Sequence, residues 1–140
     1  MQLNTYLTFD GQCEEAFSFY ARTLGGSVQS LFRHGETPGA DHVPEEWRNK
    51  VMHATLSLPG GILMGSDAPP GSASSARAGF ALALHPQEPA DAERIFSALA
   101  EGGTVQMPIQ ETFWSVRFGM LTDRFGIPWM INCEAAPQAA

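Results

Sequence analysis

One pattern occurs twice in the chain, as FYARTLGGSVQ at residues 19–29 and as FSALAEGGTVQ at residues 96–106. The copies coincide without a gap at Phe, Ala, both Gly, Val and Gln, and a Ser in the first copy meets a Thr in the second. Similarity at a spacing of about half the chain indicates one supersecondary unit built twice. The sequence therefore predicts a duplicated fold.

A second repeat, further along each half, supports the duplication. Gly60-Gly61-Ile62-Leu63-Met64 is similar to Gly126-Ile127-Pro128-Trp129-Met130, at a smaller spacing than the first pair. The first half carries a long polar insert at residues 34–50 that the second half lacks. This insert accounts for the change in spacing, and both repeats belong to one duplication.

Each half begins with a segment of alternating character, which is typical of a half-buried strand. The alternating residues are Leu3, Thr5, Leu7 and Phe9 in the first half, and Phe80, Leu82 and Leu84 in the second. After a helix, three more strands are expected in each half. They lie at about residues 28–33, 51–58 and 62–66, and at about residues 104–109, 114–121 and 128–132.

The helix of each half has recognisable ends. Glu14 and Glu15 lie in the first turn of the first helix, where the helix dipole favours anions, and Pro89 suits the first position of the second helix. Both helices end at Gly-Gly, which supplies a left-handed C-cap. The apolar stripes expected to face the sheets are Cys13, Ala16, Phe17, Tyr20 and Leu24, and Ala92, Ile95, Phe96 and Leu99.

These elements predict an α+β fold made of two tandem βαβββ units. A helix covers one face of each small sheet, and the other face curls into an open cleft. We expect a single domain, residues 1–134, with modules at about 1–67 and 77–134, a Pro/Gly/Ser-rich loop at 68–76 and a small polar tail at 135–140. Two such units side by side form a shared concave pocket, which is the usual place for a ligand.

Composition excludes several classes of partner. The chain has 140 residues, of which 44% are apolar, so it is the size of one domain with an ample core. Its formal charge of -7 repels a phosphate backbone, which argues against nucleic acid as a partner. An anionic membrane surface is disfavoured for the same reason. A small molecule is the partner that we expect.

The cysteines and the N-terminal residues bear on the compartment. Cys13 and Cys133 lie far apart and neither is part of a CxxC, which excludes a structural zinc knuckle and a disulfide scaffold. The first residues have no basic start and no apolar run, which argues against a signal peptide. No apolar stretch approaches the ~18 residues that span a bilayer. A cytoplasmic location is therefore expected.

Several motifs resemble those of a known family. They are Leu7-Thr8-Phe9-Asp10-Gly11, Met52-His53-Ala54, Met64-Gly65-Ser66-Asp67-Ala68-Pro69, Gln110-Glu111-Thr112-Phe113-Trp114 and the long run at residues 117–132, RFGMLTDRFGIPWMIN. On these stretches the chain resembles the PhnB-like branch of the vicinal oxygen chelate superfamily over nearly its whole length. That superfamily includes glyoxalase I, extradiol dioxygenases, and the fosfomycin and bleomycin resistance proteins. The resemblance implies the tandem βαβββ fold.

PhnB-like proteins have also been labelled 3-demethylubiquinone-9 3-methyltransferase. No Gly-rich strand–helix turn for a nucleotide-like cofactor occurs at the start of this chain. The fold implied is also not a Rossmann sheet. The sequence therefore does not predict a methyltransferase.

The resemblance also implies where a metal would be bound. Metal-dependent members hold a divalent ion with His or Glu from the first and last strands of each unit, and the corresponding positions here fall near Asn4, Met64, Gly79 and Met130. None of these residues is a His or a carboxylate, and a thioether is a poor ligand for such a metal. The central metal site, and with it any cofactor, is therefore expected to be absent.

His53 is the candidate catalytic residue. It lies on a predicted strand with Val51, Thr55 and Ser57 toward the cleft and Met52, Ala54, Leu56 and Leu58 on the other face. A histidine in a cleft can act as a general base or a ligand. The alternative is a hydrogen-bonded histidine with a structural role.

Further candidates line the expected cleft and would bind a ligand. They are Tyr6, Thr8, Thr55, Met64, Asp67, Trp114, Arg117, Met130 and Asn132. Asp67 fits a turn equally well. Trp114 and Arg117 have opposite parity on one predicted strand, so only one of them can face the cleft. Trp129 is expected in the core or in a dimer interface.

Other polar residues have a weaker claim. The insert at residues 34–50, with Glu45, Glu46 and Trp47, folds over the cleft as a lid or stays a solvated loop. His34, His42 and His85 lie in loops or at strand ends. Cys13 opens a helix, where a thiol pKa can fall, but no base neighbours it in sequence, so an inert buried thiol is favoured for it and for Cys133.

Three functions remain open at this point. The first is an enzyme of the vicinal oxygen chelate type that uses His53 and non-standard metal ligands. The second is a binding protein without turnover, which the missing ligands favour, because an apolar, aromatic-rich cleft binds a flat organic molecule by burial and stacking. The third is a structural or regulatory dimer. A homodimer is expected in each case, because curled sheets leave exposed edges.

Overall fold

The chain divides into two compact units, Met1–Ser74 and Ser75–Ala140. The computed structural model describes residues 1–69 and 77–134. The predicted tail at 135–140 lies outside the described residues, as does the predicted loop at 68–76 except for Ala68 and Pro69. Among the described residues, no helix is long and apolar enough to cross a membrane.

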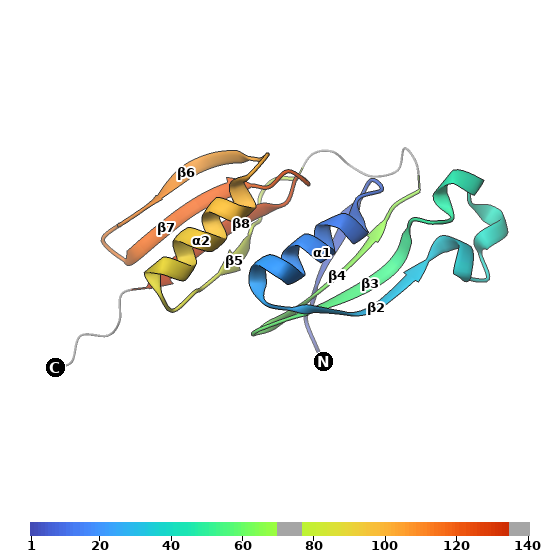
Figure 1. Ribbon diagram of the computed structural model, residues 1–140, viewed down its shortest axis with the longest axis horizontal. Helices are drawn as coiled ribbons and strands as arrows, with labels where there is room; N and C mark the ends of the chain where they lie inside the picture. The colour runs from blue at the N-terminus through green and yellow to red at the C-terminus, as the bar shows by residue number, and fades with distance from the viewer. Residues whose placement is uncertain (70–76, 135–140) are drawn as a thin grey trace. The chain divides into compact units, whose positions relative to one another are not determined.

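Both units have the predicted order of elements (Figure 1). The first unit contains β1 (Thr5–Phe9), α1 (Cys13–Leu24), β2 (Ser27–Arg33), β3 (Val51–Leu58) and β4 (Gly61–Asp67). The second contains β5 (Leu82–Leu84), α2 (Pro89–Ala100), β6 (Thr104–Gln110), β7 (Ser115–Thr122) and β8 (Pro128–Glu134). The prediction of tandem βαβββ units is confirmed.

Each unit forms one mixed four-stranded sheet. The strand order is β1-β4-β3-β2 in the first sheet and β5-β8-β7-β6 in the second. The first strand of each unit runs parallel to the last one, β1 with β4 and β5 with β8, and the remaining neighbours are antiparallel. The sheets are therefore built alike, as the repeat requires.

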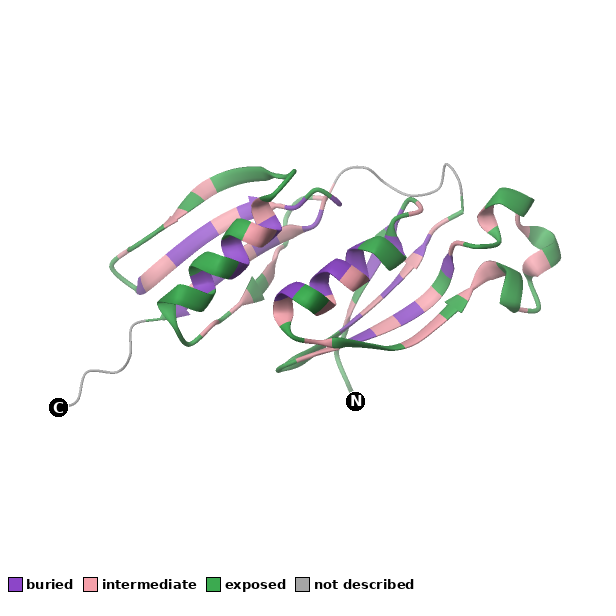
Figure 2. Cartoon of the chain, viewed as in Figure 1, coloured by how far each residue is buried: buried purple, intermediate pink, exposed green. Residues whose placement is uncertain are grey.

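A helix covers one face of each sheet, and the core lies between them. Figure 2 shows the buried side of each helix turned toward the strands. The predicted stripe of α2 is buried throughout, and that of α1 is buried except for the half-buried Leu24. On the strands, every second residue packs under the helix: Leu7 and Phe9 on β1, Ala54 and Leu56 on β3, and Trp129, Ile131 and Cys133 on β8. The core position predicted for Trp129 is confirmed.

The first and the second glycine of each repeated Gly-Gly pair have different structural roles. Gly25 and Gly102 both adopt φ 75°, which is the left-handed region that favours glycine. Gly25 caps α1, whereas Glu101 follows α2 directly and Gly102 comes one residue later. Gly26 and Gly103 face the backbone carbonyls of Ser57 and Thr122, where a Cβ would clash. The pair therefore turns the chain and lets it pass close to β3 or β7.

Three expectations about the strands need correction. Leu3 and Phe80 are exposed and precede β1 and β5, because these edge strands pair only with β4 and β8 and extend no further than that pairing. Trp114 precedes β7 instead of belonging to it. On β3, the pairing with β2 steps from His53 to Val51, so Met52 lies in an irregularity and is exposed, and Val51 is buried.

The insert at residues 34–50 forms three short 3-10 turns, His34–Glu36, Ala40–His42 and Glu45–Trp47. It is held at its base, where the backbone N–H groups of His34 and Gly35 donate to the carbonyls of Lys50 and Arg48. The Lys50 ammonium donates to the carbonyl of Gly11, 3.0 Å away, and Trp47 also lies close to Gly11. The insert is thereby attached to the segment between β1 and α1.

Candidate functional site

The sheet face of the first unit that α1 does not cover carries a group of predicted residues. We call it the first open face and define it by Tyr6, Thr8, His53, Thr55 and Met64. Tyr6 pairs in register with Met64, and Met64 pairs with Thr55. Each alternates along its strand with buried residues that pack under α1, and all five side chains are half-buried or exposed. The structure therefore brings together, on one face, predicted residues from the three strands β1, β3 and β4.

His53 lies between two hydroxyl groups on this face. The hydroxyl of Tyr6 is 3.5 Å from Nδ1, and the hydroxyl of Thr55 is 3.3 Å from Nε2. The rings of Tyr6 and His53 are tilted, with their centroids 5.8 Å apart. Both imidazole nitrogens thus have a partner within the unit.

The chemistry of these contacts follows from the imidazole ring. A neutral imidazole has one donor and one acceptor nitrogen, so one hydroxyl donates to the ring and the other accepts from it. A hydroxyl serves in either role, so both tautomers fit. The contacts are longer than the 2.7–3.2 Å that is typical for hydrogen bonds. Because they are long and half-exposed, a polar group of a ligand can replace either hydroxyl at small cost.

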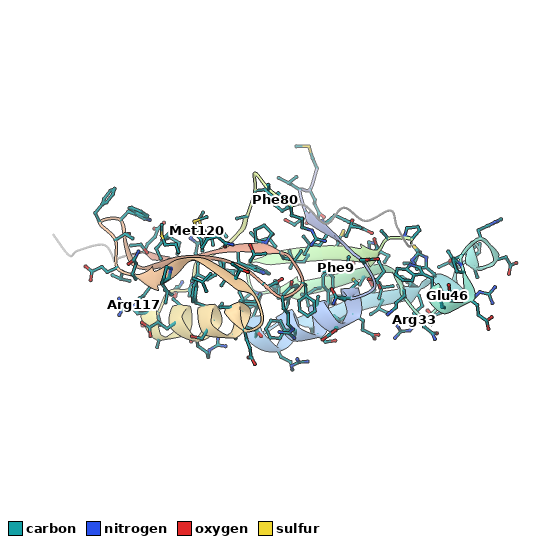
Figure 3. All side chains as sticks on the ribbon, turned by 90° about the horizontal axis from the view of Figure 1, so that it is seen from above. Phe9, Arg33, Glu46, Phe80, Arg117 and Met120 are labelled. Carbon is teal, nitrogen blue, oxygen red and sulfur yellow. The ribbon has the colours of Figure 1, made fainter. Side chains whose placement is uncertain are left out.

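The second unit has an equivalent face with a different lining. We call it the second open face and define it by Met107, Phe118, Met120, Met130 and Asn132. Met130 pairs with Met120, Asn132 with Phe118, and Met107 with Met120. Figure 3 shows Met120 on the side of this sheet away from α2. The Oδ1 atom of Asn132 is buried without a hydrogen-bond partner. Predicted residues Met130 and Asn132 are thus together on one face.

Three residues of the second open face were not among the sequence candidates. The strand register is needed to assign Met107, Met120 and Phe118 to this face. Two irregularities in the pairing of β6 with β7 make that register hard to predict from the sequence. The repeat offers one usable signal. Because Met64 corresponds to Met130, the partner of Met64 corresponds to the partner of Met130, so Met120 occupies in the second unit the place of Thr55 in the first.

Trp114 lies at the end of the second open face. It is 45% exposed, and its ring meets that of Phe118 edge to face with centroids 5.3 Å apart. Phe113, which is almost fully exposed, contacts Trp114 in the same manner at 4.7 Å. The three rings form a continuous aromatic series from the β6–β7 connection onto the sheet, so Trp114 can stack on a flat ligand.

Asp67 does not lie on the first open face. Its side chain is 2% exposed and points to the helix side, where Oδ1 accepts from the backbone N–H of Cys13 and Oδ2 from that of Val51, each at 2.9 Å. Both carboxylate oxygens are therefore engaged in joining the start of α1 to the start of β3. Asp67 thus has a structural role at the junction of helix and sheet.

Arg117 likewise lies apart from the open face. Its Nε donates to Oε1 of Glu93 on α2 at 2.7 Å, and Figure 3 shows it on the helix side of the sheet. Arg33 and Glu14 form the matching contact in the first unit, at 2.8 Å. That hydrogen bond with Arg33 lowers the pKa of the Glu14 carboxyl from its ordinary value. Arg117 is thus a tie between helix and sheet.

The donors at the inferred metal positions do not fit a divalent ion. Asn4 and Gly79 are exposed and lie outside the strands, and Met64 and Met130 present thioethers. Among residues 1–69 and 77–134, no three His, Cys, Asp or Glu side chains are grouped as metal ligands. Nε2 of His34 is 3.0 Å from the carbonyl of Asp67, and His42 and His85 are exposed.

Both thiols are expected to be inert in the folded protein. Cys13 and Cys133 are fully buried free cysteines. Burial raises the pKa of the Cys13 thiol, and Asp67 and Glu14 raise it further. Burial also raises the pKa of Cys133. Since the thiolate fraction falls as the pKa rises, Ellman's reagent at pH 8 should react with Cys13 at least tenfold more slowly in the native chain than in the unfolded one, and with Cys133 more slowly as well. Fast labelling of a native thiol would contradict this.

Known proteins are similar to this chain along nearly all its length. A family model described as 3-demethylubiquinone-9 3-methyltransferase matches residues 1–132. Protein YjdN of Escherichia coli (strain K12) is 39% identical over 140 residues, which cover 94% of this chain and 95% of YjdN. The crystal structure of protein PA1353 from Pseudomonas aeruginosa has a TM-score of 0.86 and 46% identity, and the match covers 96% of this chain and 98% of PA1353.

Two further structures connect the fold to a wider group. A PhnB protein from Bacillus cereus has a TM-score of 0.82 at 25% identity, over 95% of this chain and 99% of that one. A glyoxylase/bleomycin resistance protein/dioxygenase domain from Frankia sp. EAN1pec has a TM-score of 0.63 at 18% identity, over 96% and 98%, and shares the fold alone. The chain therefore belongs to the PhnB-like family, whose model is described as 3-demethylubiquinone-9 3-methyltransferase, and has the fold of the glyoxalase/bleomycin resistance/dioxygenase superfamily.

Proposed function

We propose that this protein binds a small organic molecule on the first open face, with His53 as the central polar contact. The observation that carries the proposal is the placement of His53 between the hydroxyls of Tyr6 and Thr55 on a face that α1 leaves uncovered. The ring of Tyr6 is 50% exposed, so it offers an aromatic surface beside the imidazole. An apolar body with one polar group is the chemistry that matches this arrangement.

The ligand that we propose is flat and carries a hydrogen-bonding group. Tyr6 and Met64, neighbours in register, offer an aromatic ring and a thioether for its body, and Thr8 extends the face along β1. His53 offers a donor or an acceptor to the polar group, depending on its tautomer. In the second unit, Trp114 and Met130 likewise offer a ring and a thioether, and Asn132 offers an amide in place of the imidazole.

We propose binding without a divalent metal. The inferred ligand positions hold an amide, a glycine and two thioethers, which are not the oxygen and nitrogen donors that such ions prefer. A proton transfer by His53 would likewise need no metal. We therefore propose that the chain is a binding protein. We also propose that it acts as a homodimer in the cytoplasm.

Native mass spectrometry of tag-free protein, purified without chelator, tests this proposal. We expect the mass of two chains, no stoichiometric zinc, nickel or manganese after their addition, and an organic mass retained as purified or captured from a set of aromatic acids, phenols and amides. His53→Ala should abolish retention of that mass, because it removes the central polar contact. His85→Ala is the matched control, since His85 is an exposed histidine at the end of β5.

Two results would overturn the proposal. If no compound binds, or if bound compounds are retained equally by His53→Ala and by His85→Ala, the first open face is not the binding site. If one divalent ion per chain is held tightly and lost on His53→Ala, the protein is a metal-dependent member of the superfamily instead.

A further inference from the structure

Three methionines form a row across the second open face. Met130 on β8 pairs in register with Met120 on β7, and Met120 pairs with Met107 on β6. Residues that pair directly in antiparallel strands, as Met120 and Met130 do, point to the same side, with Cβ atoms about 4.5–5.5 Å apart. The pairing of β6 with β7 shifts on either side of Met107, and Met107 is the residue of β6 that lies opposite Met120. All three side chains are half-buried. Three thioether sulfurs are thus carried by neighbouring strands at one level of the sheet.

The equivalent row of the first unit shows that this composition is not a requirement of the fold. There Met64 pairs with Thr55, and Thr55 pairs with Ser30, so the corresponding row has one methionine. The helix-covered sides of both sheets hold the residues that the core needs, such as Leu121 and Trp129. Met107, Met120 and Met130 lie on the opposite side. Packing under α2 therefore does not account for them.

The chemistry of thioethers points to a particular class of ligand. Sulfur ligands are soft, and methionine is among the side chains that select Cu(I) over harder divalent ions. A methionine side chain has three rotatable bonds, so the two outer sulfurs can turn toward the central one without a movement of the strands. Half-burial lets an ion enter while limiting competition from water. No charged partner is needed, because a thioether is neutral.

We propose that Met107, Met120 and Met130 form a binding site for one soft monovalent cation, Cu(I) or its redox-stable analogue Ag(I). The three thioethers bind the ion as neutral donors, with Met120 in the middle. This site is separate from the contacts of His53, Tyr6 and Thr55 and does not depend on the function proposed for them. It takes no divalent ion, because its donors are too soft for one.

Methyl NMR of the whole chain labelled with ¹³C at the methionine methyl groups tests the site directly. The chain has 6 methionines, so the three outside the row serve as internal controls. Titration with silver nitrate in chloride-free buffer should shift the methyl signals of Met107, Met120 and Met130 and saturate at one ion per chain. Cu(I) under anaerobic reducing conditions should shift the same three signals, and Zn(II) should shift none.

Two variants define the result. Met120→Leu keeps the size and apolar character of the side chain while removing the central sulfur, and it should weaken Ag(I) binding at least tenfold. Met64→Leu, at the matching position of the first unit, should bind Ag(I) as the original protein does. The folding of each variant is checked by the dispersion of its remaining methyl signals.

Any of the following results would overturn the proposal. The signals of Met1, Met52 or Met64 move together with those of the row, or the titration saturates at no defined stoichiometry. Alternatively, Met120→Leu leaves Ag(I) binding unchanged, or Zn(II) shifts the signals of the row. If binding disappears when Cys13 and Cys133 are replaced by serine in a folded variant, the thiols hold the ion and the methionine site is likewise excluded.

Discussion

Replacing Asp123 with alanine is expected to lower the free energy of unfolding by about 3–5 kcal/mol. The carboxylate is buried between β7 and β8, where Oδ1 accepts from the backbone N–H groups of Phe125 and Ile127 at 2.8 and 3.0 Å. Oδ2 accepts from Nε1 of Trp129 at 2.8 Å. Alanine leaves three donors of a buried turn without this acceptor, and urea unfolding followed by circular dichroism measures the loss.

Asp123→Asn separates the two parts of this network. If its carbonyl keeps the place of Oδ1, both backbone donors retain their acceptor while the amide NH₂ faces the indole N–H. We therefore expect an intermediate loss of about 2 kcal/mol. Combining it with Trp129→Phe removes the opposed donors, so the double variant should be more stable than the sum of the two single losses predicts. Asp41→Ala, at an exposed site in the insert, is the control and should change stability by less than about 0.5 kcal/mol. A loss below about 1 kcal/mol for Asp123→Ala would show that the turn does not depend on the carboxylate.

The second large effect concerns the repeated glycines. Gly26→Ala and Gly103→Ala are each expected to cost about 3 kcal/mol, because the new Cβ would overlap the carbonyl oxygen of Ser57 or Thr122. These carbonyls belong to strands β3 and β7, so relief of the clash requires a shift of backbone. Gly103 has a second close neighbour in the backbone of Asp123, whose Cα would lie 2.9 Å from the added Cβ.

Gly25 and Gly61 provide graded controls for this prediction. At Gly25 a Cβ meets nothing within 4 Å, but the φ of 75° would cost alanine about 1–2 kcal/mol. At Gly61 there is neither a close neighbour nor a positive φ, so alanine should change stability by less than about 0.5 kcal/mol. The urea concentration at the midpoint of unfolding should therefore be highest for Gly61→Ala, lower for Gly25→Ala and lowest for Gly26→Ala. Equal effects at Gly25 and Gly26 would refute the close approach to Ser57.

The fold was predictable because its determinants are local and occur twice. Alternation, helix stripes and Gly-Gly each span few residues, and the repeat provides a second instance against which to check every assignment. The predictions that the structure corrects concern where strands end and which face a residue occupies. Both depend on how the strands pair across the sheet. Nothing near Met52 in sequence marks the step in register that exposes it and buries Val51.

The candidate site was predictable only in part, for a related reason. Parity along a strand brought Tyr6, His53, Thr55 and Met64 to one face, since each position can be counted from its neighbours. Arg117 and Asp67 have partners far away in sequence: Glu93 on the helix for one, and the amides of Cys13 and Val51 for the other. Contacts of this kind depend on how the helix is placed over the sheet, and a single sequence does not encode that placement in any local pattern.

The parallel pairing of the first strand in each unit has a consequence for the order of folding. The strands β2, β3 and β4 follow one another and can pair through connections shorter than the unit, whereas β1 reaches β4 only after nearly the whole unit has been traversed, as Thr5 meets Leu63. Closing the longer loop costs more chain entropy, so β1 is expected to dock last, after the hairpins and helix have formed a surface to receive it. Until then the edge of β4 stays open, and the rate of this final step sets how long each newly made chain remains vulnerable to wrong pairing.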